Sequence, residues 1–287
     1  MRPSDVPTSS SSVEGRVPDM QPKPDFLGRR AASAFQDESV AEAYHHRPPY
    51  PNEAIEILTD LVVDTPRTIL DVGCGTGYLA RHLVNWADRV DALDVSRPMI
   101  DRGQFLPGGD HPGLRWIVGS AEEAPLQPPY ALITAGDSLH WMDWDVVMPR
   151  FATLLTPHGY LAILGVEQLP APWDNKLWPI RRRHSAIPNF QYYDLLEGLR
   201  DRGLFHQLGT HRTKPVTFAQ SLDDYIESFH GRAAFSQECM TPSDVASFHS
   251  EVRALVEPFC SDTVEVQLVT EVVWGKPLPP RPPVPVT

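Results

Sequence analysis

A glycine-rich turn after an apolar segment constrains this chain more than any other feature. Residues 68–72 have the composition of a buried strand, and Gly73, Gly75 and Gly77 follow in the pattern G-x-G-x-G before a helical stretch. Glycines let the backbone approach a ligand where a Cβ would collide, and the helix that follows offers unpaired amides to an anionic group. The pattern predicts a doubly wound α/β domain with a cofactor site at the carboxyl end of its first strand.

Two carboxylates and one tyrosine refine this prediction. Asp71 ends the first strand, where it can order the turn or face the ammonium group of a ligand, and both interpretations stay open. Asp94 ends the next strand, seventeen residues beyond Gly77, where a carboxylate can accept both hydroxyls of a ribose. Tyr78 occupies the third-glycine position of a dinucleotide fingerprint, and its bulk argues against a nicotinamide-dependent oxidoreductase.

Apolar periodicity predicts five alternating β–α units, a helical insertion and a late pair of strands. Strands are expected at 68–72, 89–94, 114–118, 130–135, 160–166, 213–218 and 264–274. Helices are expected at 31–44, at 52–63 with Asn52 as the cap, after the strands at 68–72, 89–94 and 130–135, within 167–204, and at 221–229 and 243–256. The prolines of 45–51 predict an extended lid-like linker.

Composition restricts the partners. The net charge of −12 argues against tight binding to nucleic acid, and no apolar run is long enough to span a bilayer. Three cysteines without metal-ligand spacing and the lack of an export signal predict no metal and a cytoplasmic setting. Both ends are rich in proline and are expected to be tails. A homo-oligomer remains open.

Four stretches carry a resemblance to a known family. The turn at 73–77 resembles motif I of class I S-adenosylmethionine (SAM) methyltransferases, and 118–126 resembles the family's adenine-edge motif, although the family usually has Asp at the position of Ser120. Residues 130–143 and 44–51 are similar to the active-site loop and N-terminal lid of the "type 11", trans-aconitate methyltransferase-like group. The resemblance implies a Rossmann-like seven-stranded sheet with its last strand antiparallel and a helical cap.

The resemblance also implies a cofactor, its residues and a domain layout. SAM is the expected donor and S-adenosylhomocysteine the product. The expected cofactor-binding residues are Tyr44, Asp71, Gly73, Cys74, Gly75, Gly77, Asp94, Val95, Met99, Ser120, Ala121, Glu122, Ala135 and Asp137. The expected parts are a tail (1–25), a SAM-binding core with a lid helix (26–166), a substrate cap with late elements (167–260), a final strand (261–274) and a Pro-rich tail (275–287).

The acceptor should lie at the mouth of the fourth strand. His140 is the candidate general base because an ordinary imidazole pKa suits proton removal at neutral pH, with a role as pocket wall as the alternative. Asp137 either faces the donor's ammonium group or caps the next helix. The expected substrate-binding residues are Tyr50, Trp141, Trp173, Arg181 and Arg182. Aromatic side chains of the insertion, Phe190 and Tyr192 among them, favour a flat or apolar acceptor, and its arginines favour one with a carboxylate or phosphate.

The functional hypothesis is methyl transfer from SAM to a small molecule through O, N or C, as in bacterial secondary-metabolite tailoring. Two alternatives remain. One is a SAM-binding protein without catalytic activity, and the other is a protein or RNA methyltransferase, which the acidic net charge disfavours.

Overall fold

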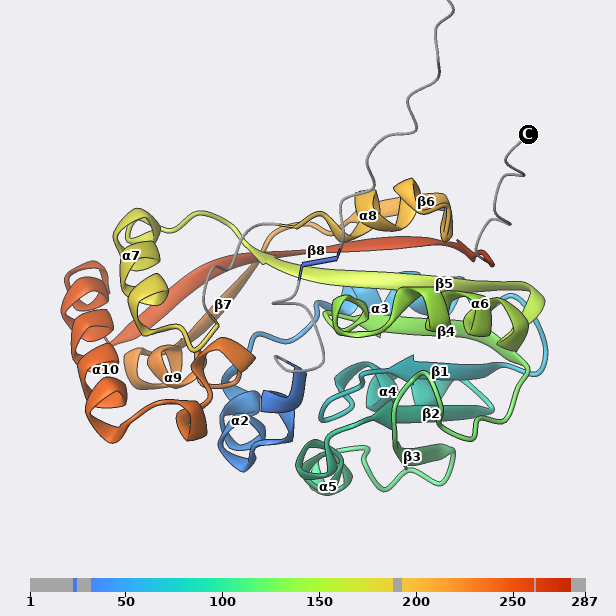
Figure 1. Cartoon of the computed structure of the whole chain (residues 1–287), viewed down its shortest axis with the longest axis horizontal. Helices are drawn as coiled ribbons and strands as arrows, with labels where there is room; N and C mark the ends of the chain where they lie inside the picture. Colours follow the sequence, from blue (N-terminus) through green and yellow to red (C-terminus); the bar gives the residue numbers. More distant parts are fainter. Residues whose placement is uncertain (1–22, 25–31, 188–192, 261, 280–287) are drawn as a thin grey trace, which may run out of the picture.

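The computed structural model describes residues 23–24, 32–187, 193–260 and 262–279 (Figure 1). The predictions for the outermost parts of the two tails, and for Phe190 and Tyr192, lie outside these residues. In the described ranges, no helix combines the length and the apolar character that crossing a bilayer requires.

One mixed sheet organises the molecule. Its strands are β1 (Thr68–Val72), β2 (Arg89–Asp94), β3 (Leu114–Val118), β4 (Tyr130–Gly136), β5 (Leu155–Gln168), β6 (Phe205–Arg212), β7 (Val216–Ser221) and β8 (Thr263–Pro277). They lie in the order β3-β2-β1-β4-β5-β8-β6, with β7 also paired to β8. The first five are parallel and β8 runs antiparallel to β5, which confirms the predicted doubly wound sheet. The strand expected at 213–218 corresponds to β7, shifted by three residues, and β6 is an eighth strand that the sequence did not predict.

Helices cover both faces of the sheet. They are α2 (Glu38–Ala43), α3 (Asn52–Asp60), α4 (Tyr78–Leu83), α5 (Arg97–Phe105), α6 (Trp144–Leu154), α7 (Asp174–His184), α8 (Leu195–Asp201), α9 (Leu222–Glu227) and α10 (Pro242–Val256). Short 3₁₀ turns are η2 (Ser33–Gln36), η3 (Tyr44–His46), η4 (Val84–Trp86), η5 (Leu139–Trp141), η6 (Ala233–Phe235), η7 (Gln237–Cys239) and η8 (Glu257–Phe259).

The central parallel strands β1, β2 and β4 are buried on both faces, and alternate side chains enter different cores. Ile69 of β1 packs in the cluster formed with α3 and α4, whereas Leu70 and Val72 pack in the cluster formed with α6 and α8. Each fully buried aliphatic side chain of this kind contributes about 1.5–3 kcal/mol. These two cores fix the carboxyl ends of β1, β2 and β4, where the site lies.

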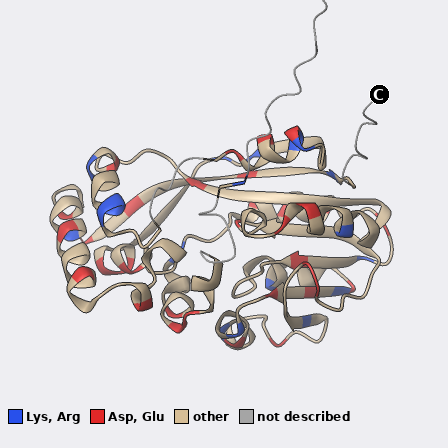
Figure 2. Ribbon diagram, viewed as in Figure 1, with Lys and Arg blue, Asp and Glu red and all other residues tan. Residues whose placement is uncertain are grey.

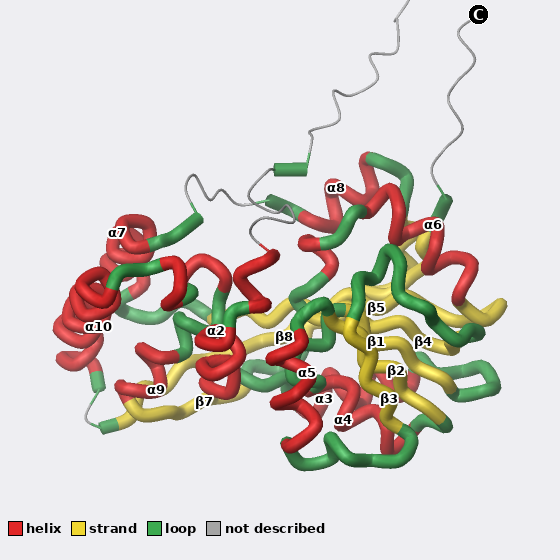
Figure 3. Tube along the Cα trace, turned by 60° about the horizontal axis from the view of Figure 1, so that its bottom comes forward, coloured by secondary structure: helices red, strands yellow, loops and turns green. Residues whose placement is uncertain are grey.

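A third core belongs to the cap. The long strands β5 and β8 extend beyond the parallel sheet and meet α7, α9, α10 and β7 (Figures 1 and 3). Val264, Val266 and Leu268 of β8 are buried in this core, while Glu265 and Gln267 are exposed, which confirms the predicted alternation. The final strand therefore serves both the cap and the parallel sheet.

Three boundaries differ from prediction. The expected helix at 31–44 is interrupted at Asp37, whose extended backbone separates η2 from α2. Asn52 is the first helical residue of α3, and Pro51 occupies the cap position without a side-chain cap. Strand β8 continues into the expected tail as far as Pro277, because its last residues pair with β6.

Candidate active site

The glycine turn joins β1 to α4 in a backbone conformation that suits glycine. Gly73, Gly75 and Gly77 have φ angles of +65°, +56° and +72°. A Cβ built on Gly73 would lie 2.5 Å from Cβ of Ser138, and one on Gly77 would lie 2.4 Å from the ring of Trp116. Side chains at these two positions would therefore both strain the backbone and collide with their neighbours.

Asp94 holds the turn from the end of β2. Its Oδ2 accepts a hydrogen bond from Gly75 N at 2.7 Å, and its Oδ1 accepts one from Ser96 N at 2.8 Å. Burial raises the pKa of this carboxyl, and the amide hydrogen bonds oppose that rise. A carboxylate has about four acceptor positions, so Asp94 keeps capacity for a ligand hydroxyl after binding these amides.

Asp71 supports the turn from behind. Its Oδ1 accepts a hydrogen bond from Thr134 Oγ1 at 2.8 Å, and its Oδ2 accepts one from Ala80 N at 3.2 Å. Burial raises the pKa of Asp71 to about 7. Of the two interpretations left open by the sequence, the geometry favours the ordering of β1, β4 and α4.

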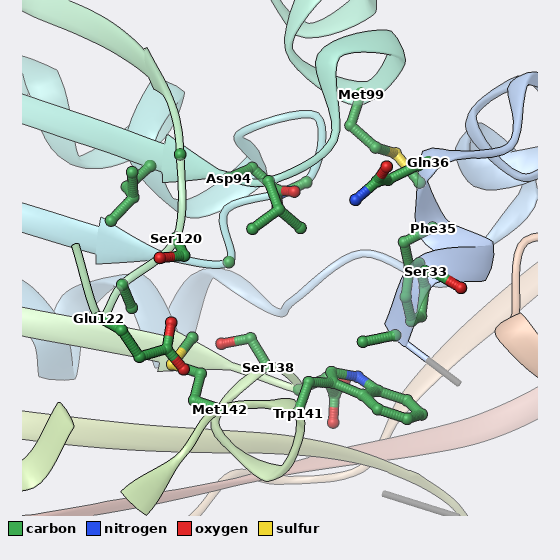
Figure 4. A pocket seen from close by; sticks show the side chains of 18 of the residues that line it. Ser33, Phe35, Gln36, Asp94, Met99, Ser120, Glu122, Ser138, Trp141 and Met142 are labelled. Atoms are coloured by element: carbon green, nitrogen blue, oxygen red, sulfur yellow. The ribbon is translucent and has the colours of Figure 1, made fainter. Parts of the chain in front are cut away.

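A cavity of about 350 Å³ opens in front of the turn (Figure 4). Ten of the expected cofactor-binding residues line it: Tyr44, Gly73, Gly75, Asp94, Val95, Met99, Ser120, Ala121, Glu122 and Asp137. Four do not, because they face the interior or a neighbouring cavity: Asp71, Cys74, Gly77 and Ala135. We call this space the donor cavity, and its volume lies within the range of small-molecule sites.

The N-terminal segment closes the donor cavity. A Cβ on Gly75 would lie 3.2 Å from the Tyr44 hydroxyl, so this ring covers the turn directly. Phe35 and Gln36 of η2 line the wall opposite Ser120, as Figure 4 shows. The sequence predicted a covering segment, but it did not identify these two residues.

A second cavity adjoins the first. This acceptor chamber has a volume of about 470 Å³ and shares Phe35, Arg47, Asp137 and Trp141 with the donor cavity. The cap supplies its other walls. They include Trp178, Arg181 and Arg182 of α7 and residues 232–235. Both expected substrate-binding arginines and Trp141 therefore line one chamber beside the donor cavity.

Positive charge accumulates in the acceptor chamber. Burial, together with Arg47 and Arg181, lowers the pKa of Arg232 to about 9. Burial also lowers the pKa of Arg181, and its Nε is buried without a hydrogen-bond partner. The guanidinium groups remain charged at neutral pH, so an anion bound between them would relieve their mutual repulsion. Elsewhere Lys and Arg lie scattered among Asp and Glu (Figure 2).

Asp137 is the acidic residue that lines both cavities. It follows β4 with a φ of +49°, a conformation that residues other than glycine seldom adopt, and its amide donates to Leu164 O at 2.9 Å. Its carboxylate lies 3.7 Å from Arg47 and accepts a hydrogen bond from Tyr50. Burial raises the pKa of Asp137, and Arg47 opposes that rise. Strain of this kind is frequent at functional sites.

Comparison with known proteins gives the family of this fold and site. Residues 69–159 match the family described as a methyltransferase domain. Malonyl-[acyl-carrier protein] O-methyltransferase of Magnetococcus marinus is 26% identical over 228 residues, which are 67% of this chain and 83% of the relative. The chain is a class I SAM-dependent methyltransferase. Its cofactor is SAM, and the donor cavity has the turn, the carboxylate and the size that SAM requires.

Two further comparisons agree with this family. Malonyl-[acyl-carrier protein] O-methyltransferase of Halalkalibacterium halodurans is 32% identical over 105 residues, which are 34% of this chain and 38% of that relative. The match with this relative therefore spans well under two thirds of the relative's length. A solved structure of a candidate type II methyltransferase from Anaeromyxobacter dehalogenans matches with a TM-score of 0.57 at 20% identity, over 81% of this chain and 99% of that chain. The match to the Anaeromyxobacter dehalogenans structure shows that the two proteins share a fold.

His140 differs from its expected state. Burial lowers its pKa to about 4, with Lys23 and Arg47 adding to the effect, so the imidazole is neutral at physiological pH. The ring lines the acceptor chamber and packs on Trp141 at a centroid distance of 4.6 Å. His140 was predicted to be a base from an ordinary imidazole pKa, which the buried ring does not have. A role in proton removal stays a prediction.

Two expected substrate-binding residues lie outside the acceptor chamber. Trp173 is 3% exposed in the core of the cap, where its Nε1 donates to the Tyr225 hydroxyl at 3.0 Å. It packs the cap because an aromatic side chain at the start of α7 faces inward. Tyr50 packs against Gly136 at the end of β4, where a Cβ would lie 2.5 Å from the tyrosine hydroxyl. Tyr50 thus acts on the site through Asp137.

No pattern in the sequence pointed to Arg232, a cation of the acceptor chamber. It lies between η6 and α9, in a stretch without regular periodicity. Its Nη1 donates to Ser228 O at 3.0 Å, and its guanidinium lies 5.1 Å from the ring centroid of Phe229. Only the folded cap brings it to Arg47.

Proposed function

We propose that this methyltransferase methylates a carboxylate oxygen of a short acyl group carried as a thioester on an acyl carrier protein. The observation that carries the proposal is the accumulation of Arg47, Arg181 and Arg232 in the chamber beside the donor cavity, where Asp137 is the neighbouring acid. The names of the relatives from Magnetococcus marinus and Halalkalibacterium halodurans supply the candidate acceptor, a malonyl group on its carrier.

The charges of the chamber suit such an acceptor. A guanidinium group binds a carboxylate through two parallel hydrogen bonds, which also fixes the direction of its oxygens. An oxygen of an ionised carboxylate already carries the electron pair needed for attack, so no side chain has to remove a proton. The neutral state of His140 is compatible with this chemistry.

The residues between the cavities provide alignment. Bound SAM supplies a methyl group on a sulfonium, whose sulfur is an already activated leaving group. Phe35 and Trp141 line both cavities, with ring centroids 5.5 Å apart, and exclude water from their junction. Arg232 and Arg181 hold the acceptor on the cap side, which converts an encounter into an oriented approach.

Methylation also changes how the chamber holds its ligand. The ester has no negative charge, so its attraction to Arg47, Arg181 and Arg232 falls once the reaction has occurred. The arginines thereby favour the substrate over the product. A carrier-bound acyl group differs from the free metabolite that the secondary-metabolite hypothesis suggested, and the chamber charge is compatible with both.

The test compares acceptors that differ only in the terminal carboxylate. The enzyme with SAM is incubated with malonyl carrier protein, acetyl carrier protein and free malonate, and mass spectrometry with fragmentation of the acyl group locates the added methyl group. We expect one methyl group on the malonyl carrier, as a methyl ester at the terminal carboxylate, and none on the acetyl carrier. Methylation of free malonate but not of the malonyl carrier would reject the carrier as the acceptor. Equal methylation of the acetyl carrier, or a methyl group on carbon, would reject the carboxylate as the methylated group.

A further inference from the structure

Three metal-ligating side chains meet in the cap, away from the donor cavity. They are Glu227 at the end of α9, His230 three residues later, and His249 of α10, and one ligand atom of each lies within 4.8 Å of the others. The two Nε2 atoms are 2.7 Å apart, and His249 Nε2 is 3.9 Å from Glu227 Oε1. Methyl transfer uses none of the three.

The ring of His230 is oriented as a ligand would be. It is fully buried, and its Nδ1 lies 2.7 Å from Phe235 O. A carbonyl oxygen only accepts, so Nδ1 carries the proton and Nε2 of the neutral ring has a free electron pair. Metal-binding histidines are commonly fixed in this way by a carbonyl behind the ring.

The two distances to His249 fit one small cation after slight movement, and the third pair of ligand atoms, on His230 and Glu227, lies within 4.8 Å. Zinc binds imidazole nitrogen at about 2.0–2.1 Å and carboxylate oxygen at about 2.0–2.2 Å in a tetrahedron, which places the ligand atoms about 3.3–3.5 Å apart. The two nitrogens must separate slightly, and the His249–Glu227 distance must shorten by a similar amount. The side chains of His249 and Glu227 are 29% and 38% exposed, so both can rotate.

We propose that Glu227, His230 and His249 bind a divalent transition metal, with Zn²⁺ as the cation that this donor set suits best. Two imidazoles and one carboxylate leave a fourth position open to water on the exposed side. The metal would tie the segment after α9 to α10. Arg232 lies two residues beyond His230, so the bond between the metal and His230 would also hold the loop that carries Arg232.

The alternative is a hydrogen-bonded histidine pair without a metal. In that arrangement His249 Nε2–H donates to His230 Nε2, and Glu227 remains a loose surface partner. Both arrangements place the rings together, but they differ in their response to added metal and to loss of the carboxylate. Glu227→Gln leaves the histidine pair intact and removes one metal ligand.

The test uses the full-length enzyme with its affinity tag removed and its metals stripped by a chelator. Zn²⁺ is titrated calorimetrically, and Co²⁺ is followed by its visible absorbance, into wild type, Glu227→Gln, His249→Gln and His158→Gln. His158 is an exposed histidine paired with Asp64 and is the matched control. We expect one equivalent of Zn²⁺ with a rise in Tm. Affinity should fall in Glu227→Gln and His249→Gln only, by at least the roughly 10- to 100-fold that loss of an outer-shell partner costs.

Two results would overturn the metal site. One is wild-type enzyme that takes up no Zn²⁺ at micromolar concentration, which would leave the histidine pair as the correct description. The other is Glu227→Gln and His249→Gln protein, folded by circular dichroism, that binds Zn²⁺ as tightly as wild type. Donor binding is measured on the same samples, so failure of this site is separate from failure of the methyltransferase assignment.

Discussion

The guanidinium of Arg47 lies 3.7 Å from the carboxylate of Asp137, at the junction of the two cavities. Arg47 comes from the N-terminal lid, with its guanidinium 5.0 Å from the ring centroid of Tyr44, and Asp137 comes from the end of β4. This ion pair therefore connects the lid segment that covers the donor cavity with the charged wall of the acceptor chamber.

Arg47→Met should weaken the binding of both SAM and the acceptor. The change removes a cation from the acceptor chamber and the contact that holds Tyr44 over the glycine turn. We expect the Kd for SAM and the KM for the acceptor each to rise by at least about 10-fold, since a charged hydrogen bond contributes about 1.5–3 kcal/mol. Calorimetry and steady-state kinetics measure the two effects. Arg102→Met, which breaks an exposed pair with Glu42, is the control.

Arg232→Met should weaken the binding of the acceptor and leave the binding of SAM unchanged. Arg232 lines the chamber from the cap and does not line the donor cavity. We expect the acceptor KM to rise by about 10- to 150-fold, the equivalent of one charged hydrogen bond, with the Kd for SAM within about twofold of wild type. Arg253→Met, at an exposed ion pair in the same cap, should leave both unchanged. An unaltered acceptor KM in Arg232→Met would remove this residue from recognition.

His140→Gln should retain most of the activity. An ionised carboxylate needs no base, whereas removal of a true general base costs about 10²–10⁴-fold in rate. We expect kcat to fall by less than about 10-fold, through altered packing on Trp141. Because the pKa of His140 is lowered to about 4, the rate should also show no step between pH 6 and 8. A loss of more than about 100-fold with unchanged SAM affinity would restore His140 as the base.

Asp71 should make stability depend on pH. Burial raises its pKa to about 7 from 3.8, so between these values the folded state keeps a proton that the unfolded state has lost. This contribution is complete below about pH 4 and disappears as pH rises through 7, with a slope of at most about 1.4 kcal/mol per pH unit. Asp71→Asn has no such proton. In urea unfolding from pH 4 to 8, the free energy of unfolding of Asp71→Asn should rise relative to that of wild type as the pH increases. The same pH dependence in both proteins would contradict this prediction.

Local sequence determined the donor cavity well and the acceptor chamber poorly. The glycine turn, Asp94 and Ser120 lie at the ends of successive strands, so the order of elements alone brings them together. Arg47 and Arg232 meet only through the path of the cap, which no short pattern encodes. Strand β6 escaped prediction because most of its residues are exposed and its stability comes from pairing with β8.

Residue type also misled where burial decides the role. Trp173 is of a residue type common in pocket walls, yet it lies in the core of the cap. An aromatic side chain packs equally well in either place. The pKa of His140 follows from desolvation, which depends on neighbours distant in sequence. The sequence could name both residues but could not choose between their roles.

The most direct test of the donor site is calorimetric titration of SAM and of NAD(H) into wild type, Asp94→Asn and Asp94→Ala. Asp94 joins Gly75 to the expected ribose position, and Asp94→Asn keeps one acceptor oxygen. We expect wild type to bind one SAM and no NAD(H), with affinity for SAM falling at least about 10-fold in folded Asp94→Ala and less in Asp94→Asn. NAD(H) binding without SAM, or equal SAM affinity in all three proteins, would contradict the assignment of this cavity.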